Sequence, residues 1–284
     1  MSAPANNVET PSGKGAQDEN FPVGSFLLPK HLRPHVEVYY GFARAIDDIA
    51  DNPDLEPDDK VERLKAMDLA LIAEAGVGDP TFDKAHRLRQ SLLETGVDFA
   101  HARDLVSAFK QDAVKNRYEN WAELIDYCNR SAAPVGRYLL ELHGEDREAF
   151  AWSDPLCNAL QVLNHLQDCA DDYRQLNRVY LPGDWMQEEG TTVEDLAQPS
   201  ASRQLLRVIR RCVGQTRVLM ADARLLPRNL YNRRLAMEAA VIVRIATALT
   251  TKLSHKDPVA TRVELSKPEF ILCGARGIVF GLLT

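Results

Sequence analysis

The fold class is decided by the segment Leu160-Gln-Val-Leu-Asn-His-Leu-Gln-Asp-Cys-Ala-Asp-Asp172. Its apolar residues recur at intervals of three, the spacing that gathers side chains on one face of an α-helix. Asn164, Asp168 and Asp172 follow one another at four-residue spacing and therefore form a polar stripe on the same helix. Because the helix is otherwise apolar, we expect part of it to be buried. A buried polar stripe is costly unless its groups are paired or bind a metal ion.

Helical spacing of apolar residues continues along most of the chain from about residue 30. Breaks rich in Gly and Pro separate the helical segments, and Thr192 followed by Asp195 predicts a capping box at the start of a short helix. Alternating strand patterns are almost absent from the sequence, the best being Arg178-Val-Tyr-Leu181. The sequence therefore predicts an all-α fold, a single-domain helical bundle of about eight helices.

Composition excludes several classes of protein. The 284 residues carry 34 basic and 41 acidic side chains, a net charge of −7, which disfavours a nucleic-acid partner. Five cysteines without a CxxC pair disfavour both a disulfide framework and a zinc site. The sequence has no apolar run of about 18 residues and no apolar leader, so we expect a cytoplasmic protein without a membrane span.

A second acidic cluster is Arg44-Ala-Ile-Asp-Asp-Ile-Ala-Asp51. Asp47 and Asp51 lie one helical turn apart, so their carboxylates project from one face of a helix. Asp48 lies one turn after Arg44, which itself lies one turn after Tyr40. Like charges at this spacing destabilise a helix unless a cation lies between them. Taken alone, the cluster fits a solvated acidic helix end as well as a binding site.

The two clusters together favour a magnesium site. Their ligands are oxygen atoms, with no His or Cys at matching intervals, which favours Mg²⁺ over zinc or iron. Mg²⁺ usually bridges a few carboxylates to a phosphate-bearing substrate. Two such helices predict a diphosphate site above an apolar pocket. The EF-hand, di-iron, HExxH, GxGxxG and P-loop patterns are absent. We interpret His165 as a residue that packs in the core or supports the metal ligands, and not as a ligand itself.

Two further segments have two interpretations each. Tyr127-Cys-Asn-Arg-Ser-Ala-Ala-Pro-Val-Gly136 places Pro and small residues in a helical pattern, which indicates either a kink that leaves room for a ligand or close helix packing. The segment Arg203–Arg244 carries ten arginines. We favour a solvated basic face for it over contact with an anionic membrane surface.

Several motifs carry a resemblance to a known family. They are Leu27-Leu-Pro29, Tyr40-x₃-Arg44-x₂-Asp47-Asp48-x₂-Asp51, Tyr127-Cys128 with Val135-Gly136, Gln161-x₂-Asn164-x₃-Asp168-x₃-Asp172, and Asn177-Arg-Val-Tyr180. On these motifs, residues from about 19 to 250 resemble the squalene/phytoene synthase family. The resemblance implies an isoprenoid-synthase fold, with residues 20–284 as the catalytic domain. The preceding residues 1–19 are rich in Pro, Gly, Ser, Asn and Gln, and this composition predicts a disordered segment.

The resemblance also implies roles for individual residues. The Mg²⁺ ligands are expected to be Asp47, Asp51, Asn164, Asp168 and Asp172. The catalytic residues are expected to be Tyr40, Arg44, Asp47, Asp48, Asp51, Asp168 and Asp172. The substrate-binding residues are expected to be Phe21, Tyr127, Gly136, Gln161, Asn164, Arg178 and Tyr180.

Some motifs are similar to one branch of the family, which makes hydroxysqualene in bacterial hopanoid biosynthesis. They are Glu19-Asn-Phe-Pro-Val-Gly-Ser25, Ser131–Gly136 and Asn164–Asp168. Gln167 stands where many members have Arg, and Val243 lies near a position where many have Tyr. Most members also carry a His- and Ser-rich motif ending in Phe, of which only Phe21 matches here. In the family, that motif and the Arg help to hold the diphosphates of two prenyl substrates. The loss of both favours an enzyme that receives presqualene diphosphate, a lipid-like substrate, and captures its rearranged cation with water.

The expected partners include the enzymes that supply this substrate and the inner membrane surface, at which the protein would be peripheral. Two alternatives remain open. One is a head-to-head prenyltransferase that makes presqualene diphosphate, squalene or phytoene. The other is a non-catalytic helical binding protein.

Overall fold

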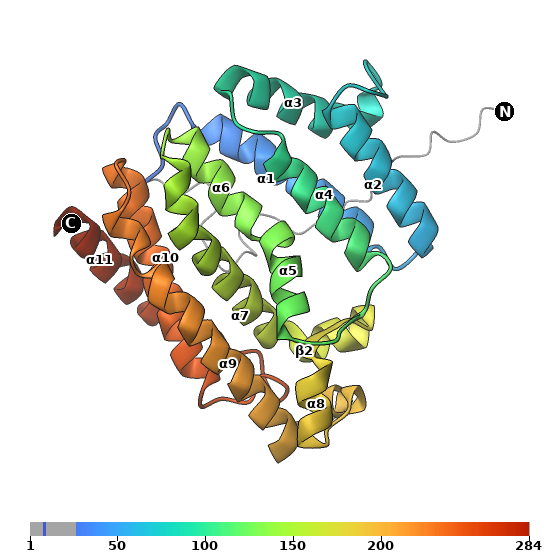
Figure 1. The fold of residues 1–284 in the computed structure, drawn as a ribbon, viewed down its shortest axis with the longest axis vertical. Helices are drawn as coiled ribbons and strands as arrows, with labels where there is room; N and C mark the ends of the chain where they lie inside the picture. Colours follow the sequence, from blue (N-terminus) through green and yellow to red (C-terminus); the bar gives the residue numbers. More distant parts are fainter. Residues whose placement is uncertain (1–7, 10–26, 284) are drawn as a thin grey trace. The chain divides into compact units, whose positions relative to one another are not determined.

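The computed structural model describes residues 8, 9 and 27–283, with side chains to residue 280. Two compact units are present, an N-terminal unit that contains Pro29–Lys115 and a C-terminal unit that contains residues 116–283 (Figure 1). Both units are built from helices, so the all-α prediction is confirmed. The expected domain, residues 20–284, stays a prediction, and residues 1–19 lie mostly outside the described part.

The N-terminal unit packs its first helix against the next three. They are α1 (Arg33–Asp51), α2 (Pro57–Leu71), α3 (Asp83–Thr95) and α4 (Ala100–Asp112), with a 3₁₀ turn at Pro80–Phe82. Phe42, Ile46 and Ile49 of α1 are fully buried, because their spacing puts them on the face that meets the other helices. Gly96, in the left-handed conformation at φ 73°, ends α3.

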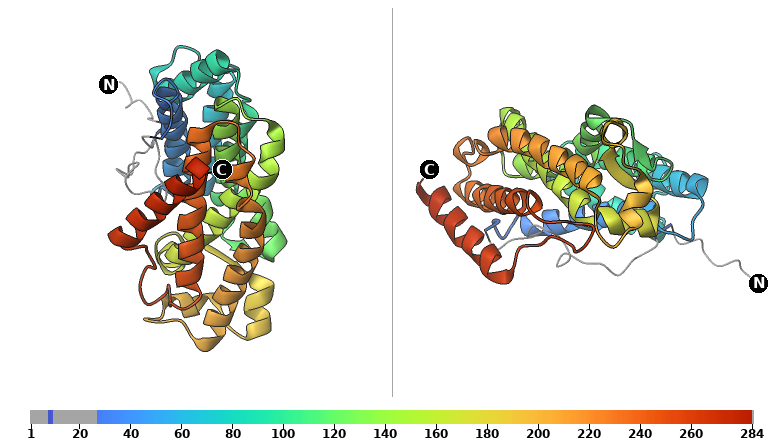
Figure 2. Two further views of the ribbon diagram at one scale, coloured as in Figure 1. Left: turned by 90° about the vertical axis from the view of Figure 1, so that its left-hand side faces the viewer. Right: turned by 90° about the horizontal axis from the view of Figure 1, so that it is seen from below.

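The C-terminal unit is organised around one long helix, α7 (Figures 1 and 2). Its helices are α5 (Trp121–Ser131), α6 (Ala133–Leu142), α7 (Phe150–Leu176), α8 (Gly183–Glu189), α9 (Arg203–Ala223), α10 (Arg233–Leu253) and α11 (Lys267–Leu283). Short 3₁₀ helices cover Arg147–Ala149, Val193–Ala197 and Leu226–Arg228. Helix α7 contacts α5, α6, α9 and α10, which makes it the scaffold of this unit.

Two short strands join the start of α5 to the end of α7. β1 (Arg117–Tyr118) pairs in parallel with β2 (Val179–Pro182), which overlaps the best strand pattern in the sequence. The predicted capping box of Thr192 and Asp195 is present and opens a 3₁₀ helix. No helix in the described part of the chain combines the length and apolar character that a membrane span requires.

The segment with Pro and small residues is both broken and closely packed. The backbone leaves helical geometry at Ala132, with φ −125° and ψ −48°, and Pro134 lies in the first turn of α6. A Cβ atom on Gly136 would lie 2.4 Å from Ser153 Oγ and 2.6 Å from Cys157 Sγ, both on α7. The expected number of about eight helices was too low, partly because this break divides one predicted kinked helix into α5 and α6.

Candidate active site

In the N-terminal unit, α1 carries a half-buried polar stripe along an otherwise largely buried helix. The stripe consists of Tyr40, Arg44, Asp47 and Asp51. Three- and four-residue intervals keep these side chains on one face, as their spacing in the sequence predicts. The stripe contains two carboxylates, one guanidinium and one phenol hydroxyl.

Arg44 lies between two of the carboxylates of this cluster. Its Nη1 is 2.7 Å from Asp47 Oδ2, and its Nη2 is 2.8 Å from Asp48 Oδ1. Asp48 is buried and lies off the stripe, and its carboxylate orients Arg44, whereas its catalytic role stays a prediction. Arg44 therefore offsets part of the negative charge of two adjacent residues, Asp47 and Asp48.

Asp47 lies in a strongly negative environment. Burial, followed by the nearby Asp51 carboxylate, raises the pKa of Asp47 to about 8, although Arg44 opposes the shift. Asp112, buried at the end of α4, adds a further negative charge. Sequence reasoning missed Asp112 because nothing in the spacing connects it with α1. A divalent cation would neutralise this charge, so the α1 stripe fits Mg²⁺ binding.

In the C-terminal unit, α7 carries a similar stripe. Gln161, Asn164, Asp168 and Asp172 are half-buried, whereas most residues between them are buried. All four side chains offer an oxygen atom, the ligand type that Mg²⁺ prefers. Among the described residues, no group of three or more His, Cys, Asp or Glu side chains is gathered closely enough to hold a metal ion. Neither stripe forms such a group by itself.

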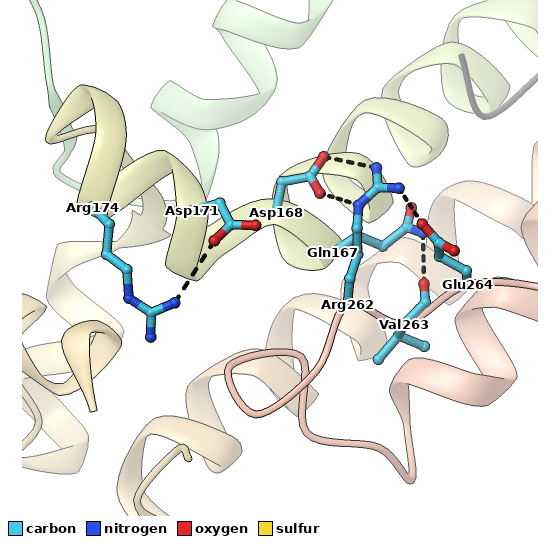
Figure 3. Close-up of polar contacts among 7 residues, drawn as sticks. All are labelled: Gln167, Asp168, Asp171, Arg174, Arg262, Val263 and Glu264. Atoms are coloured by element: carbon cyan, nitrogen blue, oxygen red, sulfur yellow. Dashed lines mark hydrogen bonds and ion pairs between the residues drawn. The ribbon is translucent and has the colours of Figure 1, made fainter. Parts of the chain in front are cut away.

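Asp168 pairs with an arginine that the sequence analysis did not identify (Figure 3). Arg262 Nε and Nη2 donate to the two carboxylate oxygens of Asp168, with 3.1 Å between Nη2 and Oδ2. The adjacent Gln167 is buried and turns away from the stripe, because its Nε2 donates to the Val263 carbonyl at 2.6 Å. Asp168 and Arg262 are 94 positions apart in the sequence, so no local pattern predicts this contact.

Aromatic rings pack together where α7 meets the two strands. The His165 ring stacks on the Tyr180 ring with 3.5 Å between centroids. The centroids of the Tyr118 and Tyr127 rings lie 5.4 Å and 5.7 Å from that of Tyr180. Burial, together with the nearby Arg178 guanidinium, lowers the pKa of His165 to about 3. His165 is therefore neutral at pH 7 and packs as the sequence suggested. The stacking partner Tyr118 was missed, since one tyrosine in a two-residue strand carries no pattern.

Gly136, a predicted substrate-binding residue, lies at a close contact between two helices. Gly136 faces Ser153 and Cys157 of α7, so its local role is close helix packing, and substrate binding there stays a prediction. Phe21 lies outside the described residues.

Part of the basic stretch is paired within the C-terminal unit. Arg207 and Arg211 of α9 form ion pairs with Glu189 and Glu188. The Arg211 guanidinium also lies 4.2 Å from the centre of the Trp185 ring. These contacts support the interpretation of the stretch as a solvated basic face.

Residues 15–269 match the sequence profile of the family described as squalene/phytoene synthase. The chain belongs to the squalene/phytoene synthase family. This confirms the resemblance carried by the two aspartate motifs. Both stripes lie within the residues that match the family. The role of each stripe residue stays a prediction.

Relatives with assigned activities differ in how similar they are to this chain. The hydroxysqualene synthase of Zymomonas mobilis is 44% identical over 260 residues, covering 91% of this chain and 86% of the relative. The hydroxysqualene synthase of Rhodopseudomonas palustris is 42% identical over 264 residues, covering 93% and 89%. By contrast, the 15-cis-phytoene synthase of a Paracoccus species is 27% identical over 92% of this chain and 86% of the relative.

Solved structures agree on the fold. Squalene synthase HpnC from Alicyclobacillus acidocaldarius is 30% identical, with a TM-score of 0.69 over 81% of this chain and 85% of that chain. A dehydrosqualene synthase solved with a ligand has a TM-score of 0.75 over 94% and 93%, at 20% identity, which shows a shared fold alone. The predicted isoprenoid-synthase type of helical fold is therefore confirmed.

Proposed function

We propose that this protein is a hydroxysqualene synthase, which converts presqualene diphosphate and water into hydroxysqualene and diphosphate. The observation that carries the proposal is the presence of both half-buried oxygen stripes, on α1 and α7, in a chain 44% identical to a hydroxysqualene synthase over 91% of its length. The reaction would break a carbon–oxygen bond, which makes the enzyme a carbon–oxygen lyase acting on a diphosphate.

The oxygen stripes would hold Mg²⁺ in this proposal. The ligands would be Asp47 and Asp51 of α1 and Asn164, Asp168 and Asp172 of α7. When bound, Mg²⁺ supplies positive charge that stabilises the departing diphosphate. Two properties support the fit: the excess negative charge around Asp47 and the oxygen-only character of both stripes.

Three other side chains would bind the diphosphate oxygens. Arg44 and Arg178 would donate charge-assisted hydrogen bonds, and Tyr180 a neutral one. Arg44 is already oriented by Asp48, so it would bind an anion without losing much side-chain freedom. Arg178 is buried next to the neutral His165, where a guanidinium interacts more strongly with an anion than it does in water.

After ionisation, the cyclopropylcarbinyl cation would rearrange in an apolar environment. Aromatic faces, with Tyr40 among them and Phe21 as a further candidate outside the described residues, would stabilise the cation by about 1–2 kcal/mol per desolvated ring. Gln161, Tyr127 and Gly136 would shape the binding site. A water molecule then forms the new C–O bond and loses one proton, so that no hydride donor is consumed.

A second candidate is a prenyltransferase that joins two prenyl diphosphates. It is supported by the phytoene synthase relatives, one of which is 27% identical over 92% of this chain. Their lower identity, compared with 44% for a hydroxysqualene synthase, makes this candidate the weaker one.

The proposal also includes partners. The enzyme would contact the inner membrane surface peripherally, and it would contact the enzymes that supply its substrate.

A product assay tests the proposal. Purified protein and Mg²⁺ are incubated with presqualene diphosphate in one tube and farnesyl diphosphate in another, and the extracts are analysed by mass spectrometry. We expect hydroxysqualene from the first tube and unchanged substrate in the second. Presqualene diphosphate, squalene or phytoene formed from farnesyl diphosphate would show that the chain belongs to another branch of the family.

Matched variants test the metal ligands. Asp168→Asn should abolish turnover and keep the fold, because the loss falls on metal binding. Asp171→Asn makes the same chemical change at an exposed position of α7, off the stripe, and should keep turnover. Near-normal turnover by the Asp168 variant would contradict the assignment of this ligand.

A further inference from the structure

Residues 257–266, here called the strap, run beside α7 and are held to the C-terminal unit at several points. Asp257 Oδ2 accepts a hydrogen bond from Ala201 N at 2.9 Å. The Val263 carbonyl accepts from Gln167 Nε2 at 2.6 Å, and the Glu264 carbonyl accepts from Lys252 Nζ at 2.8 Å. Val263 itself is buried. The strap therefore has a fixed register against α7 that does not depend on the side chain of Arg262.

This register puts Arg262 on the oxygen stripe of α7 (Figure 3). Its Nε and Nη2 donate to both carboxylate oxygens of Asp168, the first of the two aspartates of the stripe, and its Nη1 pairs with Glu264. The pair is open to water, since the Arg262 and Asp168 side chains are 37% and 23% exposed. An ion pair in this setting is weak enough to exchange for another cation.

A divalent cation at Asp168 and the Arg262 guanidinium would compete for the same oxygens. The two-pronged contact uses both of them, and the two positive charges repel each other at such short range. Glu264 offers Arg262 an acceptor on its own strap, so the guanidinium keeps one partner when it leaves Asp168. Displacement of Arg262 thus leaves no buried unpaired charge.

We propose that Arg262 is a positioning residue that latches Asp168 in the metal-free protein and lowers its affinity for the divalent cation. The proposal rests on the proposed function, which makes Asp168 a metal ligand. The latch orients the carboxylate while the metal is absent and opens when the cation displaces Arg262. The strap stays attached through Gln167 and Lys252 in both states.

Metal titration of the full chain tests the latch, with Mn²⁺ as the probe and electron paramagnetic resonance as the readout of free Mn²⁺. Arg262→Gln should bind Mn²⁺ about fivefold more tightly than the wild type, which corresponds to about 1 kcal/mol and to the value of a partly exposed ion pair. Arg262→Lys keeps the charge but loses the two-pronged geometry, so its affinity should lie between the two.

Arg174→Gln is the matched control. Arg174 pairs with Asp171 on the same helix, with 3.7 Å between Nη1 and Oδ1, and Asp171 lies off the stripe (Figure 3). Its loss removes one positive charge from the same end of α7 and should leave Mn²⁺ affinity within twofold of the wild type. An equal gain in the two glutamine variants would overturn the latch, because a general charge effect would then explain both.

Hydrogen exchange provides the second readout. Adding Mn²⁺ should change the exchange of strap amides around Arg262 in the wild type and not in Arg262→Gln. Equal Mn²⁺ affinity in wild type and Arg262→Gln, with Asp168→Asn binding weakly, would overturn the latch alone. If neither the wild type nor Arg262→Gln binds Mn²⁺, the proposed metal site fails and the latch fails with it.

Discussion

Gly136→Ala should destabilise the protein, whereas the same substitution at Gly214 should stabilise it. The added Cβ at position 136 would lie 2.4 Å from Ser153 Oγ and 2.6 Å from Cys157 Sγ, so these side chains or one of the two helices must shift. Such overpacking costs about 1–3 kcal/mol. Replacing Gly by Ala inside a helix returns up to about 1 kcal/mol. Because two contacts are violated at once, we expect a net loss of about 1–2 kcal/mol.

Gly214 is the control because it lies inside α9 with nothing within 4 Å of its added Cβ. Only the helix-propensity gain applies there, so Gly214→Ala should add up to about 1 kcal/mol to the free energy of unfolding. Urea unfolding of both variants and the wild type measures this difference directly. If Gly136→Ala is as stable as the wild type, the close approach of α6 to α7 is not a constraint.

Removing the obstructing atoms should reverse the effect at position 136. In a Ser153→Ala, Cys157→Ala background, Gly136→Ala should be neutral or stabilising, because the nearest remaining atom of residue 153 is its Cβ at 3.8 Å. This cycle separates packing from any loss of substrate binding. If the alanine costs the same free energy in both backgrounds, its effect does not come from contacts with these two side chains.

Three further predictions concern single residues. Metal-free Asp47→Asn should be more stable than the metal-free wild type at pH 8. The pKa of Asp47 is raised to about 8, so its ionisation destabilises the wild type as the pH rises from about 4 to 8, and Asn cannot ionise. Equal urea midpoints at pH 8 would contradict this. His165→Phe keeps a ring against Tyr180 and should reduce the loss of stability as the pH falls from 6.5 towards 3. The lowered pKa of His165 sets this pH window, because the unfolded chain takes up a proton there and the folded protein does not. An unchanged pH profile of unfolding would argue against a buried neutral imidazole. Arg217→Ala removes a contact with Ser254 at the surface of α9 and should leave activity in a detergent assay unchanged, so lost activity would show that the basic stretch is not peripheral.

The sequence predicts those parts of the site that depend on helical periodicity. Four-residue spacing is enough to place Asn164, Asp168 and Asp172 on one stripe, and it also places Arg44 one turn before Asp48, with which it pairs. The family follows from the same two motifs.

Contacts between distant segments could not be predicted in this way. Arg262 reaches Asp168 across 94 residues, and Asp112 adds negative charge to Asp47 from a different helix. A spacing rule describes one helix and says nothing about which loop crosses it. The two interpretations of Tyr127–Gly136 stayed open for the same reason, since the atoms that Gly136 approaches belong to α7.

The origin of the product's oxygen tests the proposed function most directly. Presqualene diphosphate is incubated with the protein and Mg²⁺ in water enriched in ¹⁸O, and the alcohol product is analysed by mass spectrometry. Capture of the rearranged cation by water predicts hydroxysqualene that carries ¹⁸O. Unlabelled presqualene alcohol, which retains the oxygen of the substrate, or an unoxygenated hydrocarbon such as squalene would contradict it.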